Sequence, residues 1–298
     1  MEYNYLEEVL ESGNLTSADM NGGKFVQKLE SQIKSFTKAK HAIAVSSGTA
    51  ALYISILALG LKNQKIAFPS FTFKATKNAI LATNNTPIPI DVRLDNMTID
   101  TKIKNVDCII PVHLYGNVSY MDELLELGIP IIEDCCQSLG SKLHTRSTGT
   151  FGDLGCFSFY PSKIISSGEG GMIITNNDQL AEKCRLLRNH GDDKTWGLNF
   201  RMSEIHASIA VEMAESINKI LDKRMEKANL WKELLKNEEF SEPRKNEIRN
   251  NILFTITTTN RNELIKKYPQ SRIYYPYTLG AGSNAELLSK TVLSFPTT

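Results

Sequence analysis

The chain has 298 residues, of which 41% are hydrophobic, enough for a substantial core in one large domain or two unequal ones. The 34 Lys and Arg residues nearly balance the 33 Asp and Glu residues, so the formal net charge is +1. This balance excludes a global attraction to nucleic acid or anionic membranes, and any bound anion must be held by a local site.

Neither a secretory signal nor a membrane span is expected. The N-terminus, MEYNYLEEVLESG, is acidic and lacks a basic stretch followed by an apolar one. No apolar run approaches the roughly 18 residues needed to cross a bilayer. The 5 cysteines include no C-x-x-C pair, which favours buried free thiols over a disulfide or metal framework. We therefore expect a soluble cytosolic protein without a metal site.

Strand-like and helix-like segments alternate in the first part of the chain. Val- and Ile-rich runs predict strands, and segments of about ten residues with helical periodicity separate them. This alternation predicts an α/β fold with a mostly parallel sheet covered by helices on both faces. In chain order, we expect a strand at 41–47, a helix at 47–60, a strand at 65–70, a helix at 71–83, strands at 86–92 and 107–115, a helix at 120–128, strands at 129–136, 155–163 and 170–177, and a helix at 178–191.

The character of the sequence changes at Met202, where a long amphipathic helical pattern begins and continues to residue 235. We place a domain boundary inside this pattern, between Lys219 and Leu221, which gives a large domain at 1–220 and a smaller α+β domain at 221–298. The elements expected after the pattern are a strand at 251–259 and helices at 262–268 and 284–293.

Three segments carry residue types that suit chemistry, and the first is SGTA at 47–50, between an expected strand and an expected helix. A small, glycine-containing helix start exposes free N–H groups and the positive end of the helix dipole, which suits a phosphate. Thr49 adds a hydroxyl donor. An ordinary helix cap has the same composition, and without a following Gly-Lys-Ser/Thr the segment is not a Walker motif.

The second segment is EDCCQ at 133–137, which places an acidic pair at the carboxyl end of an expected buried strand. Ligands gather at these ends in parallel sheets. A carboxylate there must be paired or solvated. Asp134 taken alone is as consistent with a helix cap as with a ligand contact.

The third segment is GCFSFYPSK at 155–163, where an apolar, aromatic stretch leads to Lys163 and then to a glycine-rich turn at 166–171. A lysine amine in a dry site can act as a nucleophile and proton carrier. A surface lysine between a strand and a loop has the same local pattern, so this segment alone leaves both interpretations open.

Taken together and in order, these segments resemble the DegT/DnrJ/EryC1/StrS family of pyridoxal-phosphate-dependent sugar aminotransferases. The resemblance covers residues 6–225 well and the rest weakly. It implies the aspartate-aminotransferase type of fold, with a seven-stranded-type sheet in a large cofactor-binding domain and a smaller, shortened C-terminal domain. The segments that carry it are SGTAAL, FPSFTFKATKNAI, PVHLYGN, EDCCQSLGS, GTFGDLGCFSFYPSK, SSGEGGMIITNN, LRNHG and GLNFRMSEIHASI.

The resemblance implies roles around the ring of the cofactor. Lys163 matches the lysine that bonds the cofactor covalently and moves the proton during transfer. Asp134 matches a carboxylate that faces the pyridine nitrogen, where a negative charge keeps this nitrogen protonated and the ring able to accept electrons. Gln137 matches a residue near the phenolic oxygen. Phe73 matches an aromatic side chain that stacks on the ring, with an ordinary core position as the alternative.

The resemblance also implies a phosphate site and an active site shared between subunits. The phosphate would lie on the turn formed by Gly48, Thr49 and Ala50 and on the hydroxyl of Ser158. Asn199 matches a residue that reaches the phosphate from the neighbouring subunit, so a homodimer is implied.

Three further residues, His190, Arg201 and Glu169, lie in matching segments near the expected substrate side. Arg201 would hold a carboxylate of the amino donor or form a structural ion pair, and the roles of the other two are open. The implied reaction transfers an amino group from glutamate to a keto group on a nucleotide-linked deoxysugar. The segments that close the substrate side in relatives are shortened here: the N-terminal arm, residues 238–271 and the C-terminal end.

Three alternatives remain from the sequence. A sugar dehydratase of the same fold carries a histidine in place of the lysine, and Lys163 argues against it. A non-catalytic regulatory or assembly protein on this fold fits the shortened termini but not the complete cofactor set. A plain nucleotide-binding α/β protein would use the turn at 47–50 and leave the lysine segment unexplained.

Overall fold

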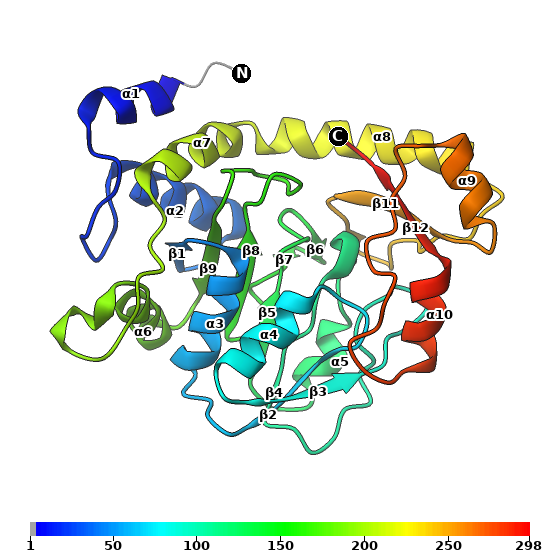
Figure 1. Ribbon diagram of the computed structural model, residues 1–298, viewed down its shortest axis with the longest axis horizontal. Coiled ribbons are helices and arrows are strands. Elements are labelled where there is room, and N and C mark those ends of the chain that lie inside the picture. Colours follow the sequence, from blue (N-terminus) through cyan, green and yellow to red (C-terminus); the bar gives the residue numbers. More distant parts are fainter. Residues whose placement is uncertain (1–3) are drawn as a thin grey trace.

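The computed structural model describes residues 4–298, and its centre is a sheet with helices on both faces (Figure 1). Backbone hydrogen bonds order one group of strands as β1-β9-β8-β5 and another as β3-β2-β4. Parallel bridges from Ile109 to Ile131 and from Val112 to Asp134 join the two groups. The strands are β1 (His41–Val45), β2 (Lys65–Pro69), β3 (Thr86–Ile90), β4 (Cys108–Ile109), β5 (Ile132–Asp134), β8 (Leu154–Ser158) and β9 (Gly171–Thr175).

Among these seven strands, β9 is the one that runs antiparallel to its neighbours β1 and β8. The pairs β2–β3, β2–β4 and β5–β8 are parallel. The mostly parallel, seven-stranded-type sheet expected from the sequence is therefore confirmed. Its parallel strands all end at the same edge.

Helices cover both faces because the strands are apolar on both sides. Along β1, Ala42 and Ala44 pack into one core cluster, and Ile43 and Val45 pack into another, as alternating side chains in a strand must. The first cluster includes residues of α1 (Asn4–Ser12), α2 (Lys24–Thr37) and α7 (Glu204–Glu215), and the second includes residues of α3 (Gly48–Ala58), α4 (Lys74–Ala82) and α6 (Asp178–Arg188).

Two of the expected elements are interrupted in the structure, the strand at 107–115 and the helix at 202–235. Within the strand expected at 107–115, continuous pairing is limited to β4 and Val112 forms an isolated bridge, because Pro111 has no amide hydrogen to donate to a ladder. The chain then turns through η1 (Leu114–Gly116), where Tyr115 has a φ of 58°. The helical pattern at 202–235 is broken at Ser216, where φ is −103° and ψ is 11°, into α7 and α8 (Ile217–Leu234).

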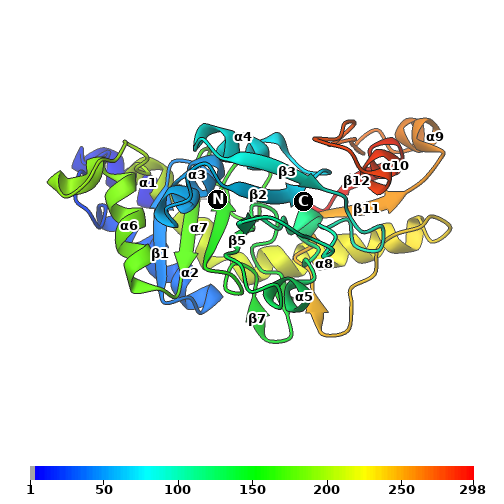
Figure 2. The same cartoon turned by 90° about the horizontal axis from the view of Figure 1, so that it is seen from below.

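The C-terminal part contains a small antiparallel sheet of β11 (Leu253–Thr257) and β12 (Val292–Pro296), beside α9 (Arg261–Lys267) and α10 (Ser283–Thr291). The helix expected at 284–293 ends at Thr291, because Val292 and Leu293 pair with β11 instead. Figure 2 shows this part at one end of the molecule and α1 with α6 at the other. The boundary expected near residue 220 falls inside α8 and stays a prediction.

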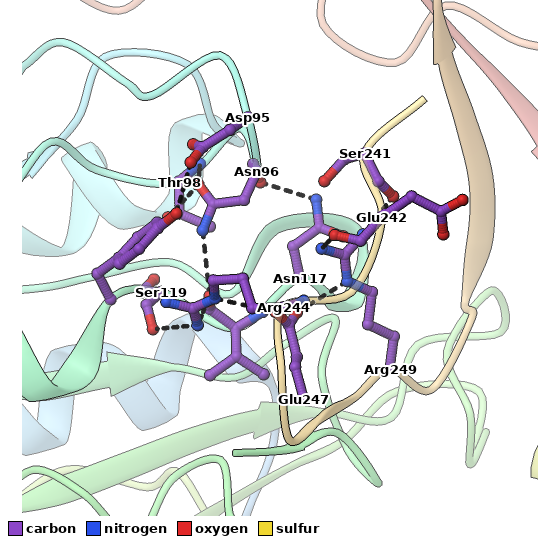
Figure 3. A network of polar contacts seen from close by, with 12 residues as sticks. Asp95, Asn96, Thr98, Asn117, Ser119, Ser241, Glu242, Arg244, Glu247 and Arg249 are labelled. Atoms are coloured by element: carbon purple, nitrogen blue, oxygen red, sulfur yellow. Dashed lines mark hydrogen bonds and ion pairs between the residues drawn. The ribbon is translucent and has the colours of Figure 1, made fainter. Parts of the chain in front are cut away.

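A network of hydrogen bonds and ion pairs connects the segment after α8 to the large part of the molecule (Figure 3). The buried Glu247, in β10 (Glu247–Ile248), accepts hydrogen bonds from Val118 N at 3.0 Å, Arg249 Nε at 2.8 Å and Arg244 Nε at 3.0 Å. Arg244 donates in turn to the carbonyl oxygens of Val118 and Ser119. β10 also pairs with β6 (Lys142–Leu143), which pairs with β7 (Arg146–Ser147). The remaining short helices are α5 (Met121–Leu125) and η2 (His190–Asp193).

The cysteines are free thiols, as expected from their spacing. Four are buried, and Cys136 is half-buried. Across residues 4–298, no helix combines the length and the apolar character that a bilayer crossing requires.

Candidate active site

A cavity of about 360 Å³ lies at the edge of the sheet where the parallel strands end. Its wall includes residues that follow β1, β2, β4, β5 and β8. Four residues from the C-terminal part, Ile252, Leu253, Tyr274 and Tyr275, complete the wall. The cavity therefore depends on both the large and the small part of the molecule.

Most of the site residues expected from the sequence line this one cavity. Asp134 stands at the end of β5, Ser158 at the end of β8, and Lys163 follows in the turn after β8. The structure thus brings together segments that are far apart in the chain. The expected residues in the wall are Gly48, Thr49, Phe73, Asp134, Gln137, Ser158, Lys163 and Glu169.

Four expected site residues lie outside the cavity wall of this chain. Ala50 is buried, and its amide donates to Ser47 Oγ at 3.1 Å. His190 and Asn199 are exposed. The half-buried Arg201 donates from Nη1 to Asn189 Oδ1. Their roles stay predictions.

The first turn of α3 lies very close to Cys136 and Ser158. Ser47 caps the helix in an extended conformation. A Cβ atom on Gly48 would lie 2.7 Å from Cys136 Sγ and 2.8 Å from Ser158 Cβ, so only glycine lets the helix start come this near to both. Thr49 is exposed beside it and lines the cavity. The result is a cradle of helix N-terminus and hydroxyl groups that suits a phosphate.

Asp134 is 5% exposed and is held on both carboxylate oxygens. Oδ2 accepts from Thr76 Oγ1 at 2.8 Å, and Oδ1 accepts from Cys136 N at 3.1 Å. Burial, followed by the charge of Asp134, raises the pKa of the Cys136 thiol, which therefore stays neutral. Asp134 is then the buried acidic group of this wall, and it can face a basic ring nitrogen.

The neighbouring Glu133 points away from the cavity, because successive side chains of a strand alternate. His113 Nδ1 accepts from Ser119 N at 3.0 Å, so Nε2 carries the hydrogen that His113 donates to Glu133 at 2.9 Å. His113, Glu133 and Cys135 lie close enough together to resemble metal ligands, but these bonds give the group a structural role. Glu133 also accepts from the backbone amides of Gly149, Phe151 and Gly152.

The cavity fits a flat ring that carries a phosphate. The cradle at Gly48 would take the phosphate, and Asp134 would face a protonated ring nitrogen. Phe73, 49% exposed, offers a flat face, and the half-buried Lys163 offers an amine. This donor set matches pyridoxal phosphate.

Sequence reasoning missed the part of the wall supplied by the C-terminal region. Tyr274 and Tyr275 belong to the run YYPY at 274–277, in a region where the family resemblance is weak. The run of aromatic residues was a usable signal, but an aromatic cluster is also typical of a core. Thr76, which donates a hydrogen bond to Asp134, lies inside the segment FPSFTFKATKNAI, but no role was expected for it.

Comparisons with known proteins agree with this geometry. The sequence profile of the DegT/DnrJ/EryC1/StrS aminotransferase family matches residues 1–279. A relative from Vibrio cholerae, "GDP-perosamine synthase", is 32% identical over 249 residues, which is 78% of this chain and 67% of that protein. A relative from Geobacillus stearothermophilus, "Pleiotropic regulatory protein", is 29% identical over 98% of this chain and 87% of its own. The crystal structure of NtdA from Bacillus subtilis with bound cofactor PMP has a TM-score of 0.88 and 28% identity, over 98% of this chain and 76% of that chain.

Proposed function

The chain belongs to the DegT/DnrJ/EryC1/StrS aminotransferase family, and from this premise we propose that it transfers the amino group of glutamate to a keto group on a nucleotide-linked deoxysugar. The family and the relative with bound PMP confirm the expected cofactor, pyridoxal phosphate, and the expected class of enzyme, an aminotransferase. The finer proposal is supported by one observation: a single cavity is lined by Lys163, Asp134, Gln137 and the turn at Gly48.

When bound, pyridoxal phosphate supplies a ring that accepts the electrons of a carbon losing its proton. In the proposed mechanism, the Lys163 amine would hold the cofactor covalently and would move a proton at the substrate carbon. The Asp134 carboxylate would keep the ring nitrogen protonated. Gln137 would donate a hydrogen bond to the phenolic oxygen.

The remaining residues that we propose to contact the cofactor would hold it in position. Thr49 and Ser158 would bind the phosphate with their hydroxyls, at the positive end of the α3 dipole. Phe73 would cover one face of the ring and exclude water. Glu169 lies exposed in the cavity wall, where it is available to a sugar hydroxyl.

The nucleotide-linked sugar is proposed from the relatives. The Vibrio cholerae protein carries a name that contains a GDP-linked amino sugar, and the match spans about two thirds of its length. The glutamate donor is proposed from the family resemblance. Arg201 and His190 are candidates for the donor carboxylate and the sugar, and both lie outside the cavity wall of one chain.

A homodimer is part of the proposal. Asn199 is exposed on the segment between α6 and α7, beside Trp196 at 57% exposure and Leu198 at 45%. Large apolar side chains gathered on one exposed segment are typical of a protein contact. In the proposed dimer this segment places Asn199 near the cofactor phosphate of the partner subunit.

A regulatory protein on the same fold is the second candidate. It is favoured by the name of the Geobacillus stearothermophilus relative, which matches 98% of this chain. The two candidates differ in one property: an aminotransferase must exchange its amino group with glutamate, and a regulator need not.

The proposal is tested in two steps. Purified protein with pyridoxal phosphate is mixed with glutamate, and the visible absorbance and the formation of 2-oxoglutarate are followed. The protein is then incubated with glutamate and keto-sugars linked to GDP, UDP and dTDP, and amino-sugar products are detected by mass spectrometry. We expect glutamate to bleach the visible band and one sugar class to be aminated.

The outcomes separate the candidates. Cofactor binding without any response to glutamate would contradict the aminotransferase proposal and favour the regulator. Bleaching by glutamate without amination of any sugar in the panel would contradict the proposed acceptor alone.

A further inference from the structure

Tyr275 is a buried residue of the cavity wall, and no role was expected for it from the sequence. It is 6% exposed and comes from the loop between α9 and α10. Its ring packs edge-on against Phe71, with centroids 5.6 Å apart at 81°, and lies 5.7 Å from the ring of Tyr115. These contacts fix the position of its hydroxyl group.

The hydroxyl of Tyr275 is bonded to Gln137, which is expected beside the cofactor. Gln137 Nε2 donates to Tyr275 Oη at 2.8 Å, and Gln137 Oε1 accepts from Tyr115 N at 2.9 Å. Tyr115 presents its amide from a left-handed conformation, with φ at 58°, that bulky residues rarely adopt. Both ends of the Gln137 amide are therefore set by the chain itself.

This arrangement leaves hydrogens available to a ligand. The Gln137 amide has two N–H groups, and Tyr275 takes one of them. Tyr275 accepts that bond with a lone pair, and among residues 4–298 its own hydrogen has no hydrogen-bond acceptor. Burial raises the pKa of Tyr275, so this hydrogen is retained.

We propose that Tyr275 is a positioning residue for the amino-transfer site: it fixes the Gln137 amide so that the second N–H points to the phenolic oxygen of the cofactor. The proposal rests on the function proposed above. The oxygen of Gln137 already accepts from a backbone amide, while one of its N–H groups has no partner in the described part of the chain, so the open group that this side chain presents to a ligand is a donor. A donor suits an oxygen that carries negative charge.

A spectroscopic titration tests this role without relying on activity. Donors that draw charge from the phenolic oxygen lower the proton affinity of the bound chromophore. Tyr275→Phe should therefore raise the pH midpoint of the cofactor's absorbance change by about one pKa unit, the size expected from one lost hydrogen bond. Tyr277→Phe is the matched control, because its ring lies 6.4 Å from that of Tyr275 and its residue is outside the wall.

A double variant separates positioning from direct contact. If Tyr275 acts through Gln137, Gln137→Leu should raise the midpoint by itself, and adding Tyr275→Phe should change it no further. Equal midpoints for Tyr275→Phe and Tyr277→Phe would overturn the proposal, as would additive shifts in the double variant. If Tyr275→Phe fails to fold, as judged by circular dichroism, an unshifted Gln137→Leu midpoint would overturn the proposal instead.

The wild-type protein is measured first. If it forms no visible band with pyridoxal phosphate, the proposed function fails, whatever Tyr275 does. If the band forms and titrates but the variants leave its midpoint unmoved, only the inference about Tyr275 fails.

Discussion

Asp134 is fixed before any ligand reaches it, since Thr76 Oγ1 and Cys136 N each bind one of its oxygens. A carboxylate held in this way needs no reorganisation when a charged ring nitrogen faces it, and preorganised charge is a large source of catalysis. The candidate site therefore includes partners such as Thr76, which position the residues proposed to contact the cofactor.

Replacing the acid tests its charge. Asp134→Asn keeps the shape but removes the negative charge, so amino transfer should fall by on the order of 10²-fold or more. Thr76→Val removes one hydrogen bond to Asp134 and should reduce turnover by only about tenfold. Steady-state rates with glutamate measure both. A rate for Asp134→Asn equal to that of Thr76→Val would contradict the assigned role.

Motifs in the sequence identified the residues with unusual local chemistry. Lys163 and the turn at Gly48 stand in recognisable patterns, and the structure brings both to one cavity. Tyr275 was not predicted, because its contact with Gln137 joins residues separated by 138 positions in the chain. Such a contact results from packing between the two parts of the molecule, and the local sequence pattern around either residue does not predict it.

Among the elements, α3 links the core to the site. Its body is buried against the sheet, while its first turn forms the proposed phosphate cradle. The strand before it and the helix itself were predicted from local periodicity. The crowding at Gly48 was not predicted, because Cys136 follows β5 and Ser158 ends β8, and both are far from Gly48 in the chain.

A methyl group at the start of α3 should fill this cradle. Gly48→Ala would press a Cβ to 2.7 Å from Cys136 Sγ, so the helix start must shift. We expect the dissociation constant for pyridoxal phosphate to rise at least about tenfold, which corresponds to about 1.4 kcal/mol. Absorbance titration measures it, with Ala58→Ser at the far end of α3 as a control. An unchanged constant would place the phosphate elsewhere.

The C-terminal strand β12 was harder to predict than the strands of the large sheet. β12 has an apolar run, VLSFP, that does not separate strand from helix by periodicity. It becomes a strand because β11 offers an antiparallel partner. By contrast, β1 and β9 were recognised because each is a β-branched, apolar run bounded by turn residues.

For the whole molecule, the network around Glu247 joins the C-terminal part to the large part. Burial disfavours the charged form of Glu247, but the charge and hydrogen bond of Arg249, with the amides of Val118 and Arg244, outweigh it. The pKa of Glu247 is therefore below its ordinary value of 4.5. A lowered pKa means that the carboxylate stabilises the fold above pH 4.5, and this stabilisation is lost as the pH falls through the folded-state value.

Glu247→Gln should lower the free energy of unfolding by about 1.5–3 kcal/mol at neutral pH, the range for hydrogen bonds to a charged group. The difference from wild type should shrink as the pH falls below 4.5. Urea denaturation at a series of pH values measures this. Lys290→Gln removes the exposed ion pair between Lys290 and Glu286 and serves as a control, with little expected effect on the free energy of unfolding. A difference that stays constant down to the lowest pH would contradict the assigned charge.

The proposed dimer is also a property of the whole molecule. Light scattering of the wild-type protein should give twice the chain mass of 33.3 kDa. Trp196→Asp should shift it towards a single chain and weaken cofactor binding, because Asn199 would be withdrawn from the partner's site. Leu230→Asp, at an equally exposed position on α8, should leave the dimer intact. A monomeric wild type with full cofactor affinity would contradict the shared site.

The most direct test of the account is to locate the bond between the chain and its cofactor. Wild-type protein is loaded with pyridoxal phosphate, reduced with borohydride, digested and analysed by mass spectrometry, with folded Lys163→Ala as the control. We predict the cofactor's mass on the peptide that contains Lys163 and no label in the variant. Label on another lysine, or equal label in the variant, would contradict the placement of the amine in this cavity.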